Sequence, residues 1–295
     1  MRIWGGRRRL AALAMLATVW ILAGGALRAN AAEKTVLTIV GTGDSEDLLR
    51  TMAARFMREN PDITVQVPDS TGSTIGIKEV LAGKAVFART ARPLTDEEKN
   101  QGLEERVFAT VPVVFAVNRS VTGVSTLTAE QILAIFSGPP QDWSQVGAPA
   151  GPIARICREM PGSSRLAVNT AIPDFANLTC EGQAVAYTTH DVVDMLAHNA
   201  GTIGYTSLSS ITTAGVTPLA FEGVVPSAQT LANRTYPLFI PLALAYKAPL
   251  PPAAAHFLEV LASPDAATLL SRFGCLPQAA PTAPGAVVGA EPAAQ

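Results

Sequence analysis

The sequence has few of the residues from which metal sites and nucleophilic catalytic sites are usually built. It contains 3 His and 3 Cys among 295 residues, without the spacing of metal ligands, which argues against a transition-metal site. It also lacks a Walker phosphate loop and a Gly-x-Ser-x-Gly nucleophile elbow. Charged residues make up only 16% of the chain and the formal net charge is -2, so the composition gives no electrostatic basis for binding nucleic acid.

The rest of the composition is that of a folded globular chain. Hydrophobic residues account for 48% of the 295 residues, enough for one large domain or two medium ones with a core that needs no metal or disulfide. This apolar content, with 22 Pro and 23 Gly, excludes a mostly disordered chain and a collagen.

The N-terminus has the organisation of an export signal. Arg2 and residues 7–9 form a basic head, residues 10–27 form an apolar run, and residues 29–31 give the small-x-small pattern that signal peptidase cleaves. A membrane anchor is the alternative, because the apolar run has the minimum length for a membrane span. The cleavage pattern favours a signal peptide over residues 1–31 and export to the periplasm, by the general secretory or the twin-arginine route.

Removal of this segment changes the charge of the chain. The segment carries five Arg and no acidic residue, so the mature protein has 17 basic and 24 acidic residues and a net charge of -7. An acidic mature protein is a poor partner for nucleic acid and for anionic membranes. Any bound anion must therefore be held by local donors and against the overall field.

The cysteines allow one disulfide in an oxidising compartment. Cys157 and Cys180 would close a loop of about 20 residues, which is worth roughly 3 kcal/mol in the chain-entropy model. This leaves Cys275 over. Three pairings are possible, and a buried reduced cysteine is the alternative for each.

Hydrophobic periodicity predicts alternating strands and helices. The expected strands are 35–40, 63–67, 85–88, 107–117, 153–156, 202–206 and 238–245, and the expected helices are 74–82, 191–199, 252–262, 264–273 and those that begin after residues 45, 95, 128 and 164. Capping boxes at Thr95 and Thr128 support two of the helices. The alternation predicts an α/β fold with a parallel sheet, and the Ala/Pro/Gly-rich residues 277–295 predict a disordered tail.

A strand, a turn of small hydroxyl residues and a helix recur at three places. The turns are 41–45, 71–74 and 162–164, and Arg158 precedes the third. Each turn directs unpaired backbone N–H groups and the positive end of a helix dipole outward, which suits an anion. Taken alone, each is better explained as an ordinary helix cap. Their convergence, with Arg158 available for a bidentate contact, predicts an anion site.

An ordered set of motifs along the chain supports this interpretation. The set consists of Gly72-Ser73-Thr74-Ile75-Gly76-Ile77-Lys78, Leu81-Ala82-Gly83, Arg92-Pro93-Leu94-Thr95, Leu127-Thr128, Ile135-Phe136-Ser137-Gly138, Asp142-Trp143, Cys157-Arg158, Gly162-Ser163 and Gly201-Thr202-Ile203-Gly204-Tyr205. It resembles phosphate-type periplasmic solute-binding proteins, the substrate-binding components of ABC importers, over roughly residues 35 to 250. The resemblance implies a type II periplasmic binding protein fold, with two α/β lobes, two crossovers and a ligand cleft between the lobes.

The resemblance also implies a domain organisation. Lobe 1 would comprise residues 32–117 and 208–276, and lobe 2 would comprise residues 118–207. The hinge would lie near 117–120 and 205–210. Lobe closure around the ligand would then present the closed shape to a membrane transporter.

The implied ligand is a small inorganic oxyanion, with phosphate as the first candidate. The expected ligand-binding residues are Thr42, Ser45, Glu46 through its amide, Ser73, Thr74, Arg158, Gly162, Ser163 and Ser164. The resemblance implies a monomer that works with an inner-membrane ABC permease in uptake or sensing. It implies no catalysis, no cofactor, no metal and no nucleic acid.

Two departures from the family pattern weaken phosphate as the ligand. Phosphate binders have an Asp where this sequence has Ala91, and that Asp accepts a proton from the ligand. The third turn reads Gly-Ser-Ser-Arg over residues 162–165, where the family usually has Gly-Ser-Gly-Thr. Without the acceptor, the site loses its discrimination against sulfate-like anions. Asp44 or Glu159 could supply a carboxylate instead.

Further residues near the motifs have open roles. Arg89, Arg92 and Arg165 add positive charge, and Arg92 could line the cleft or lie in a solvated loop. Trp143 is better explained as a core residue than as a ligand platform.

Two other functions remain as alternatives. Residues 43–45 read Gly-Asp-Ser, like the nucleophile block of GDS-type serine esterases, but the residues three positions before His190, His198 and His256 are Tyr, Met and Ala rather than the Asp of that family. The second alternative is a binding-protein-like protein that has lost its anion ligand.

Overall fold

The computed structural model describes residues 34–138, 142–158, 160, 162–212 and 214–278. The expected signal peptide, residues 1–31, and most of the expected tail lie outside these residues. The chain divides into two compact units at Thr35, and the elements described below belong to the second unit, Val36–Gln295, apart from the first residue of β1. In the described residues, no helix is long and apolar enough to cross a membrane.

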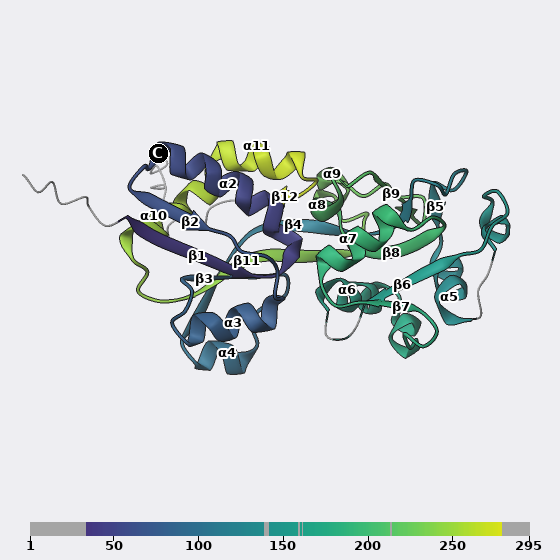
Figure 1. Ribbon diagram of the computed structural model, residues 1–295, viewed down its shortest axis with the longest axis horizontal. Coiled ribbons are helices and arrows are strands. Elements are labelled where there is room, and N and C mark those ends of the chain that lie inside the picture. The colour runs from purple at the N-terminus through teal and green to yellow at the C-terminus, as the bar shows by residue number, and fades with distance from the viewer. Residues whose placement is uncertain (1–33, 139–141, 159, 161, 213, 279–295) are drawn as a thin grey trace, which may run out of the picture. The chain divides into compact units, whose positions relative to one another are not determined.

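One sheet forms the centre of this unit (Figure 1). Its strands follow the order β2-β1-β3-β11-β4-β8-β6-β7, and β9 and β12 also pair with β4. The strand bounds are β1 Thr35–Gly41, β2 Ile63–Gln66, β3 Phe87–Thr90, β4 Leu103–Asn118, β6 Ala154–Arg158, β7 Ala184–Ala186, β8 Thr202–Ser207, β9 Val216–Pro218, β11 Phe239–Lys247 and β12 Leu276–Pro277. A separate parallel pair joins β5 (Thr126–Leu127) and β10 (Ala220–Phe221).

The long strand β4 belongs to both halves of the sheet. Its residues 103–112 pair antiparallel with β11, and residues 113–117 pair antiparallel with β8. We call the part from β2 to β11 the first half and the part from β8 to β7 the second half. Strands β1 and β3 are parallel, as are β6, β7 and β8, which confirms the expected parallel pairing. The complete sheet is mixed, because β4 and β11 run against their neighbours.

The helices match the expected positions closely. Their bounds are α2 Glu46–Glu59, α3 Ser73–Leu81, α4 Asp96–Asn100, α5 Ala129–Ser137, α6 Ser163–Ala171, α7 Thr189–His198, α8 Leu208–Ile211, α9 Ala228–Ala232, α10 Pro252–Leu261 and α11 Pro264–Arg272, with short 3-10 helices η1 Gly43–Ser45, η2 Trp143–Val146 and η3 Pro173–Asn177. Both expected capping boxes are formed, at Thr95 and Thr128. Each satisfies backbone donors that would otherwise be unpaired at the start of a helix.

Helices cover both faces of the first half of the sheet. Helices α2, α10 and α11 pack on one face, and α3 and α4 lie on the other (Figure 1). The core between α2 and the sheet includes Phe56, Phe87 and Phe257, whose rings contact one another. In the second half, Phe115, Phe136 and Tyr205 form a second aromatic group with Phe175. These cores fix the strand ends on which the candidate site depends.

Strand pairing places two short segments in the last third of the chain. Strand β9 pairs with residues 116–118 at the far end of β4, and β10 pairs with β5, so residues 216–221 lie with the second half. Such short strands carry too little periodicity to show their partners in the sequence. Pro277, expected in the disordered tail, is instead part of β12 and pairs with Ala109.

Candidate functional site

The first turn joins β1 to α2 and contains the buried Ser45. Its Oγ atom has no hydrogen-bond partner, although the residue is only 1% exposed. Thr42 caps η1, because its hydroxyl oxygen accepts the N–H of Asp44 at 3.4 Å. Gly41 has a φ of 122°, and a Cβ there would lie 2.2 Å from the carbonyl oxygen of Arg89, so only glycine fits this close approach.

The second turn is tied to the first through the backbone. The N–H groups of Thr71 and Gly72 both donate to the carbonyl of Gly41, at 3.1 and 3.2 Å. Ser73 then begins α3, and its hydroxyl oxygen accepts the N–H of Ala91 at 3.2 Å. The turns at Ser45 and Ser73 are therefore brought together at the carboxyl ends of neighbouring strands, as the sequence predicts.

The third turn lies in the second half and carries a buried arginine. Arg158 ends β6 and is 6% exposed, yet its Nε and Nη1 atoms have no hydrogen-bond partner. Ser164, in the first turn of α6, is 1% exposed and its Oγ also lacks a partner. Gly162 and Ser163 are half-buried at the same turn. Buried donors without partners are costly in a folded protein and point to a bound ligand that accepts them.

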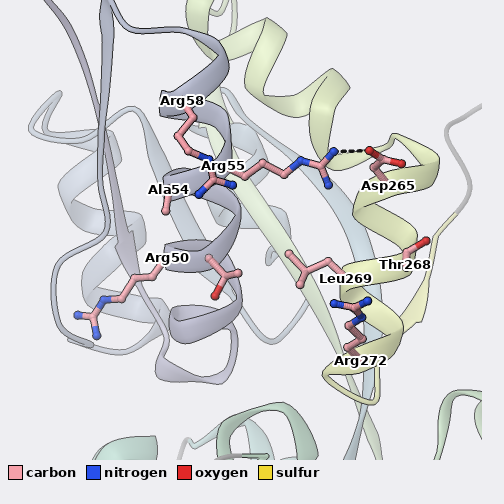
Figure 2. A pocket seen from close by; sticks show the side chains of 9 residues that line it. Arg50, Ala54, Arg55, Arg58, Asp265, Thr268, Leu269 and Arg272 are labelled. Atoms are coloured by element: carbon pink, nitrogen blue, oxygen red, sulfur yellow. Dashed lines mark hydrogen bonds and ion pairs between the residues drawn. The ribbon is translucent and has the colours of Figure 1, made fainter.

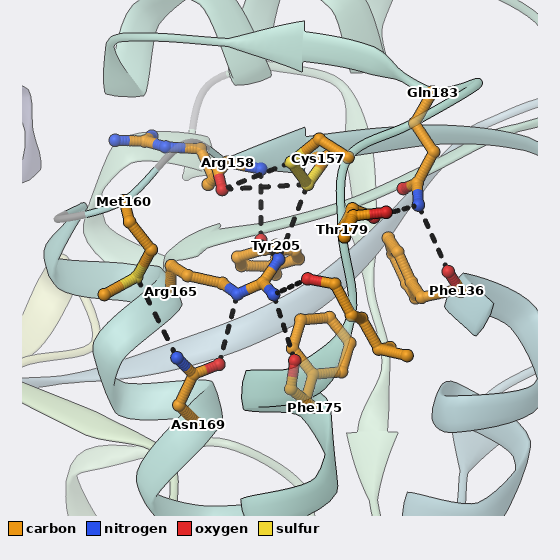
Figure 3. The surroundings of a disulfide bond; sticks show 12 residues. Phe136, Cys157, Arg158, Met160, Arg165, Asn169, Phe175, Thr179, Gln183 and Tyr205 are labelled. Atoms are coloured by element: carbon orange, nitrogen blue, oxygen red, sulfur yellow. Dashed lines mark hydrogen bonds between the residues drawn. A yellow bond between two sulfur atoms is a disulfide. The ribbon is translucent and has the colours of Figure 1, made fainter.

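A disulfide braces the strand that ends at Arg158 (Figure 3). Cys157 and Cys180 are bonded, with Cα atoms 5.6 Å apart. Beneath them, Arg165 donates from Nη2 to the carbonyls of Phe175 and Leu178, at 3.0 and 2.6 Å. The guanidinium of Arg165 also lies 4.6 Å from the centre of the Phe175 ring. Its donors are thus engaged within the second half, unlike those of Arg158.

Asp191 is the carboxylate that balances part of the charge of Arg158. It accepts the N–H groups of Thr188 and Tyr187, at 2.8 and 3.0 Å, in the first turn of α7. Burial opposes ionisation of Asp191, but these hydrogen bonds and the nearby charge of Arg158 outweigh it and lower the pKa of the carboxyl. These effects favour the ionised form of Asp191, while Nε and Nη1 of Arg158 have no hydrogen-bond partner.

The first half of the sheet also contains a buried arginine. Arg89 is fully buried, and its Nη2 donates to the carbonyls of Gly41 and Pro68, at 3.3 and 3.0 Å. Glu46 Oε2 lies 3.6 Å away, while Nε and Nη1 of Arg89 have no partner. Desolvation lowers the pKa of Arg89 to about 10, and Glu46 partly offsets this effect. The buried Oγ1 of Thr90, the next residue, is also without a partner.

The sequence predicts only that Arg89 adds positive charge near the motifs, and it predicts no role for Thr90. A charged residue inside the otherwise apolar strand β3 was the available signal, because a buried charge needs a local reason. The contacts of the Arg89 side chain with the carbonyls of Gly41 and Pro68 could not be read from spacing.

Other expected residues have different roles or surroundings. Thr42 directs its hydroxyl to Asp44, and Thr74 is exposed at the surface. The Glu46 side chain pairs with Arg50 at 2.8 Å and has a pKa raised mainly by burial, while its amide begins α2.

Hydrogen bonds and ion pairs show the roles of Arg92, Trp143 and Asp44. Arg92 forms a two-pronged ion pair with Glu98, at 2.8 and 2.7 Å, so its donors are engaged. Trp143 is buried, and its Nε1 donates to the carbonyl of Gly201 at 3.1 Å, as a core residue. Of the two carboxylates considered as replacements for the missing Asp, Asp44 is already bonded by hydroxyl groups, and Glu159 lies outside the described residues.

No catalytic constellation surrounds Ser45 in the described part of the chain. Its Oγ makes no hydrogen bond, so no histidine is in place to take its proton. His190 is exposed at the start of α7. The described residues also contain no group of His, Cys, Asp and Glu that could hold a metal ion.

A pocket lies between α2 and α11, away from these three turns (Figure 2). It has a volume of about 590 Å³ and is lined by four arginines, Arg50, Arg55, Arg58 and Arg272, with Asp265. Arg55 pairs with Asp265, and Arg50 pairs with Glu46 and Asp69. Carboxylates thus already neutralise half of its arginines, and no buried unpartnered donor belongs to its lining.

The family follows from the match of the chain to known proteins. A family model described as a PBP superfamily domain matches residues 28–265. The chain belongs to the PBP superfamily. Among its relatives, a phosphate-binding protein PstS from Bacillus subtilis is 29% identical over 232 residues, covering 78% of this chain and 76% of that protein. Another PstS, from Borreliella burgdorferi, is 24% identical over 216 residues, covering 70% and 77%.

Solved structures of PBP proteins share the fold. A substrate-binding protein from Clostridium perfringens with bound phosphate has a TM-score of 0.73 at 22% identity, covering 83% of this chain and 100% of that chain. An ABC-type phosphate transport receptor from Vibrio cholerae has a TM-score of 0.60 at 25% identity, covering 81% and 99%. The likeness confirms the expected α/β fold of two lobes.

Proposed function

We propose that the protein is a solute-binding protein that captures phosphate or a closely related tetrahedral oxyanion. The observation that carries the proposal is the set of buried hydrogen-bond donors without partners at the first and third turns. These donors are the hydroxyls of Ser45 and Ser164 and the guanidinium of Arg158. The names of the PstS relatives and the phosphate in the Clostridium perfringens structure support phosphate as the first ligand to test.

The donors suit an oxyanion for electrostatic reasons. Each charge-assisted hydrogen bond in a buried site contributes about 1.5–3 kcal/mol, and bidentate contacts from arginine add geometric selectivity. Backbone N–H groups at the starts of α2, α3 and α6 add partial positive charge. The remaining expected contacts, from Thr42, Glu46, Ser73, Thr74, Gly162 and Ser163, form part of this proposal.

The wider role follows from the family and the N-terminus. We place the protein in the periplasm after cleavage of residues 1–31, as a monomer that delivers its ligand to an ABC permease and catalyses no reaction. Lobe 1 would comprise residues 32–117 and most of 208–276, and lobe 2 would comprise residues 118–207 with the strands at 216–221. Closure of the lobes would remove water from the ligand and strengthen its contacts.

Calorimetric titration of the purified mature protein tests the proposal. Phosphate, phosphonate, sulfate, molybdate and arsenate are titrated separately into the wild type, Arg158→Gln and Arg272→Gln. Arg272 is an exposed arginine of α11, outside the three turns and the expected hinge, and serves as the matched control. We expect at least one tetrahedral oxyanion to bind the wild type and the control equally, and Arg158→Gln to lose more than 100-fold in affinity. Native affinity in Arg158→Gln would contradict the assigned site, and no binding of any anion would contradict the function.

A further inference from the structure

Asp44 is a buried carboxylate whose partners are hydroxyl groups. It is 3% exposed and accepts hydrogen bonds from Thr42 Oγ1 at 2.7 Å, Thr189 Oγ1 at 3.2 Å and Ser207 Oγ at 2.9 Å. Its backbone carbonyl accepts a further bond from Ser209 Oγ at 2.7 Å. Among the described residues, no lysine or arginine forms an ion pair with it. The hydroxyls therefore replace the water that an isolated buried carboxylate would lose.

These partners come from distant parts of the chain. Thr189 begins α7 and is 145 positions from Asp44, whereas Ser207 ends β8 and is 163 positions away. The adjoining Gly43 packs closely on the same helix start, since a Cβ on Gly43 would lie 2.9 Å from Cβ of Thr189. The turn that carries Ser45 is thus fastened to the second half of the sheet, where Arg158 lies.

The start of α7 links this contact to the candidate anion site. Asp191, two residues after Thr189, is the carboxylate that interacts with Arg158. Both residues belong to the first turn of one helix, whose capping box at Thr188 holds them in a fixed geometry. Asp44 therefore joins the turn of Ser45 to the start of α7, and in the same helix turn Asp191 feels the charge of Arg158.

We propose that Asp44 is a positioning residue that fastens the first turn to α7 and so stabilises the closed arrangement of the anion site. We call Asp44 with Thr42, Thr189, Ser207 and Ser209 the Asp44 clasp. The hydrogen bonds of Asp44 to Thr189 and Ser207 allow Ser45 and Arg158 to contact the same ligand. These hydrogen bonds must break before Ser45 and Arg158 can move apart. This inference rests on the proposed binding function, because the clasp acts on the lifetime of the bound anion.

The clasp makes a kinetic prediction for phosphate. Thr189→Val removes one donor to Asp44 at nearly constant size, and Thr189→Ser keeps the hydroxyl. Thr170→Val is the matched control, because Thr170 donates only to Leu166 in its own exposed helix turn. By stopped-flow fluorescence, we expect Thr189→Val to release phosphate about tenfold faster, and Thr189→Ser and Thr170→Val to behave as the wild type.

Small-angle scattering of the ligand-free protein tests the clasp without phosphate. We expect Thr189→Val and Asp44→Asn to have a larger radius of gyration than the wild type and Thr170→Val, with urea unfolding midpoints close to that of the wild type. Wild-type scattering in both variants would overturn the proposal, as would unchanged phosphate release in Thr189→Val. If the wild type binds none of the five oxyanions, the proposed function fails, and the scattering comparison alone decides whether the clasp exists.

Discussion

The backbone N–H of Arg158 donates to the hydroxyl oxygen of Tyr205 at 3.0 Å. The same oxygen lies 3.4 Å from Nη1 of Arg165, so one buried phenol connects the two arginines. They nevertheless differ in chemistry, because Arg165 uses its donors on protein carbonyls and Arg158 keeps two nitrogen atoms without a partner. This contrast separates an arginine that stabilises the fold from one that is available to a ligand.

Arg165→Gln is expected to act on stability. The substitution leaves the buried carbonyls of Phe175 and Leu178 without their donor, which costs about 1–3 kcal/mol for each group. We expect the free energy of unfolding in urea to fall by about 3 kcal/mol. Arg158→Gln, in contrast, should leave it nearly unchanged while abolishing anion binding. Equal unfolding curves for Arg165→Gln and wild type would contradict the structural role.

Removal of the disulfide is expected to weaken the protein through its unfolded state. Cys157 and Cys180 are separated by 23 positions, and a loop of this size contributes about 3 kcal/mol in the chain-entropy model. We predict this loss for the Cys157→Ser, Cys180→Ser double variant, measured by denaturant unfolding. Cys275→Ser is the control variant, because Cys275 is buried and forms no disulfide. Reduction with dithiothreitol should lower the stability of the wild type and of Cys275→Ser, which retain the disulfide, and should leave the double variant unchanged.

Sulfate is expected to compete with phosphate for the wild-type site. Ala91 is 1% exposed, and its N–H donates to the hydroxyl of Ser73. Under the proposed function, its methyl group replaces the carboxylate that accepts a proton from the ligand in phosphate binders. Ala91→Asp should weaken sulfate at least tenfold more than phosphate, because sulfate carries no proton at neutral pH and is repelled. Ala91→Asn, which adds similar volume without charge, is the control. Equal losses for both anions in Ala91→Asp would contradict this explanation of selectivity.

The pair formed by Arg92 and Glu98 is expected to make stability depend on pH. The hydrogen bond from Arg92, together with N–H and hydroxyl contacts at Thr95, lowers the pKa of Glu98 in the folded protein despite partial burial. A lowered folded pKa contributes stability above the unfolded pKa, and this contribution disappears as the pH falls through the folded pKa. Arg92→Gln should therefore cost about 1–2 kcal/mol at pH 7 and almost nothing near pH 3. A cost that is constant between these pH values would contradict the assignment.

The sequence is most informative where local chemistry decides the structure. The capping boxes at Thr95 and Thr128 predict helix starts because the cap residue and its partner are three positions apart. Parallel strands in the first half follow from strand–helix alternation. The short strands β5, β9 and β10 are missed, because two or three residues show no period and their partners are distant.

The candidate site is harder to predict from the sequence, because ligand binding depends on which hydrogen-bond donors have no partner within the protein. Spacing singles out Ser45, Ser73 and Arg158 at helix starts and strand ends. It does not distinguish Arg158 from Arg165, whose partners are carbonyls brought close only by the fold. It also leaves the role of Asp44 open, since Thr189 and Ser207 are far away along the chain.

The shared strand β4 has a consequence for how the protein unfolds. Its first residues pair with β11 and its last with β8, so melting of either half removes hydrogen-bonding partners from a strand that runs into the other. A fragment that ends within β4 would expose an unpaired edge of the kind that promotes aggregation. We therefore expect the two halves to unfold together, in one transition rather than two.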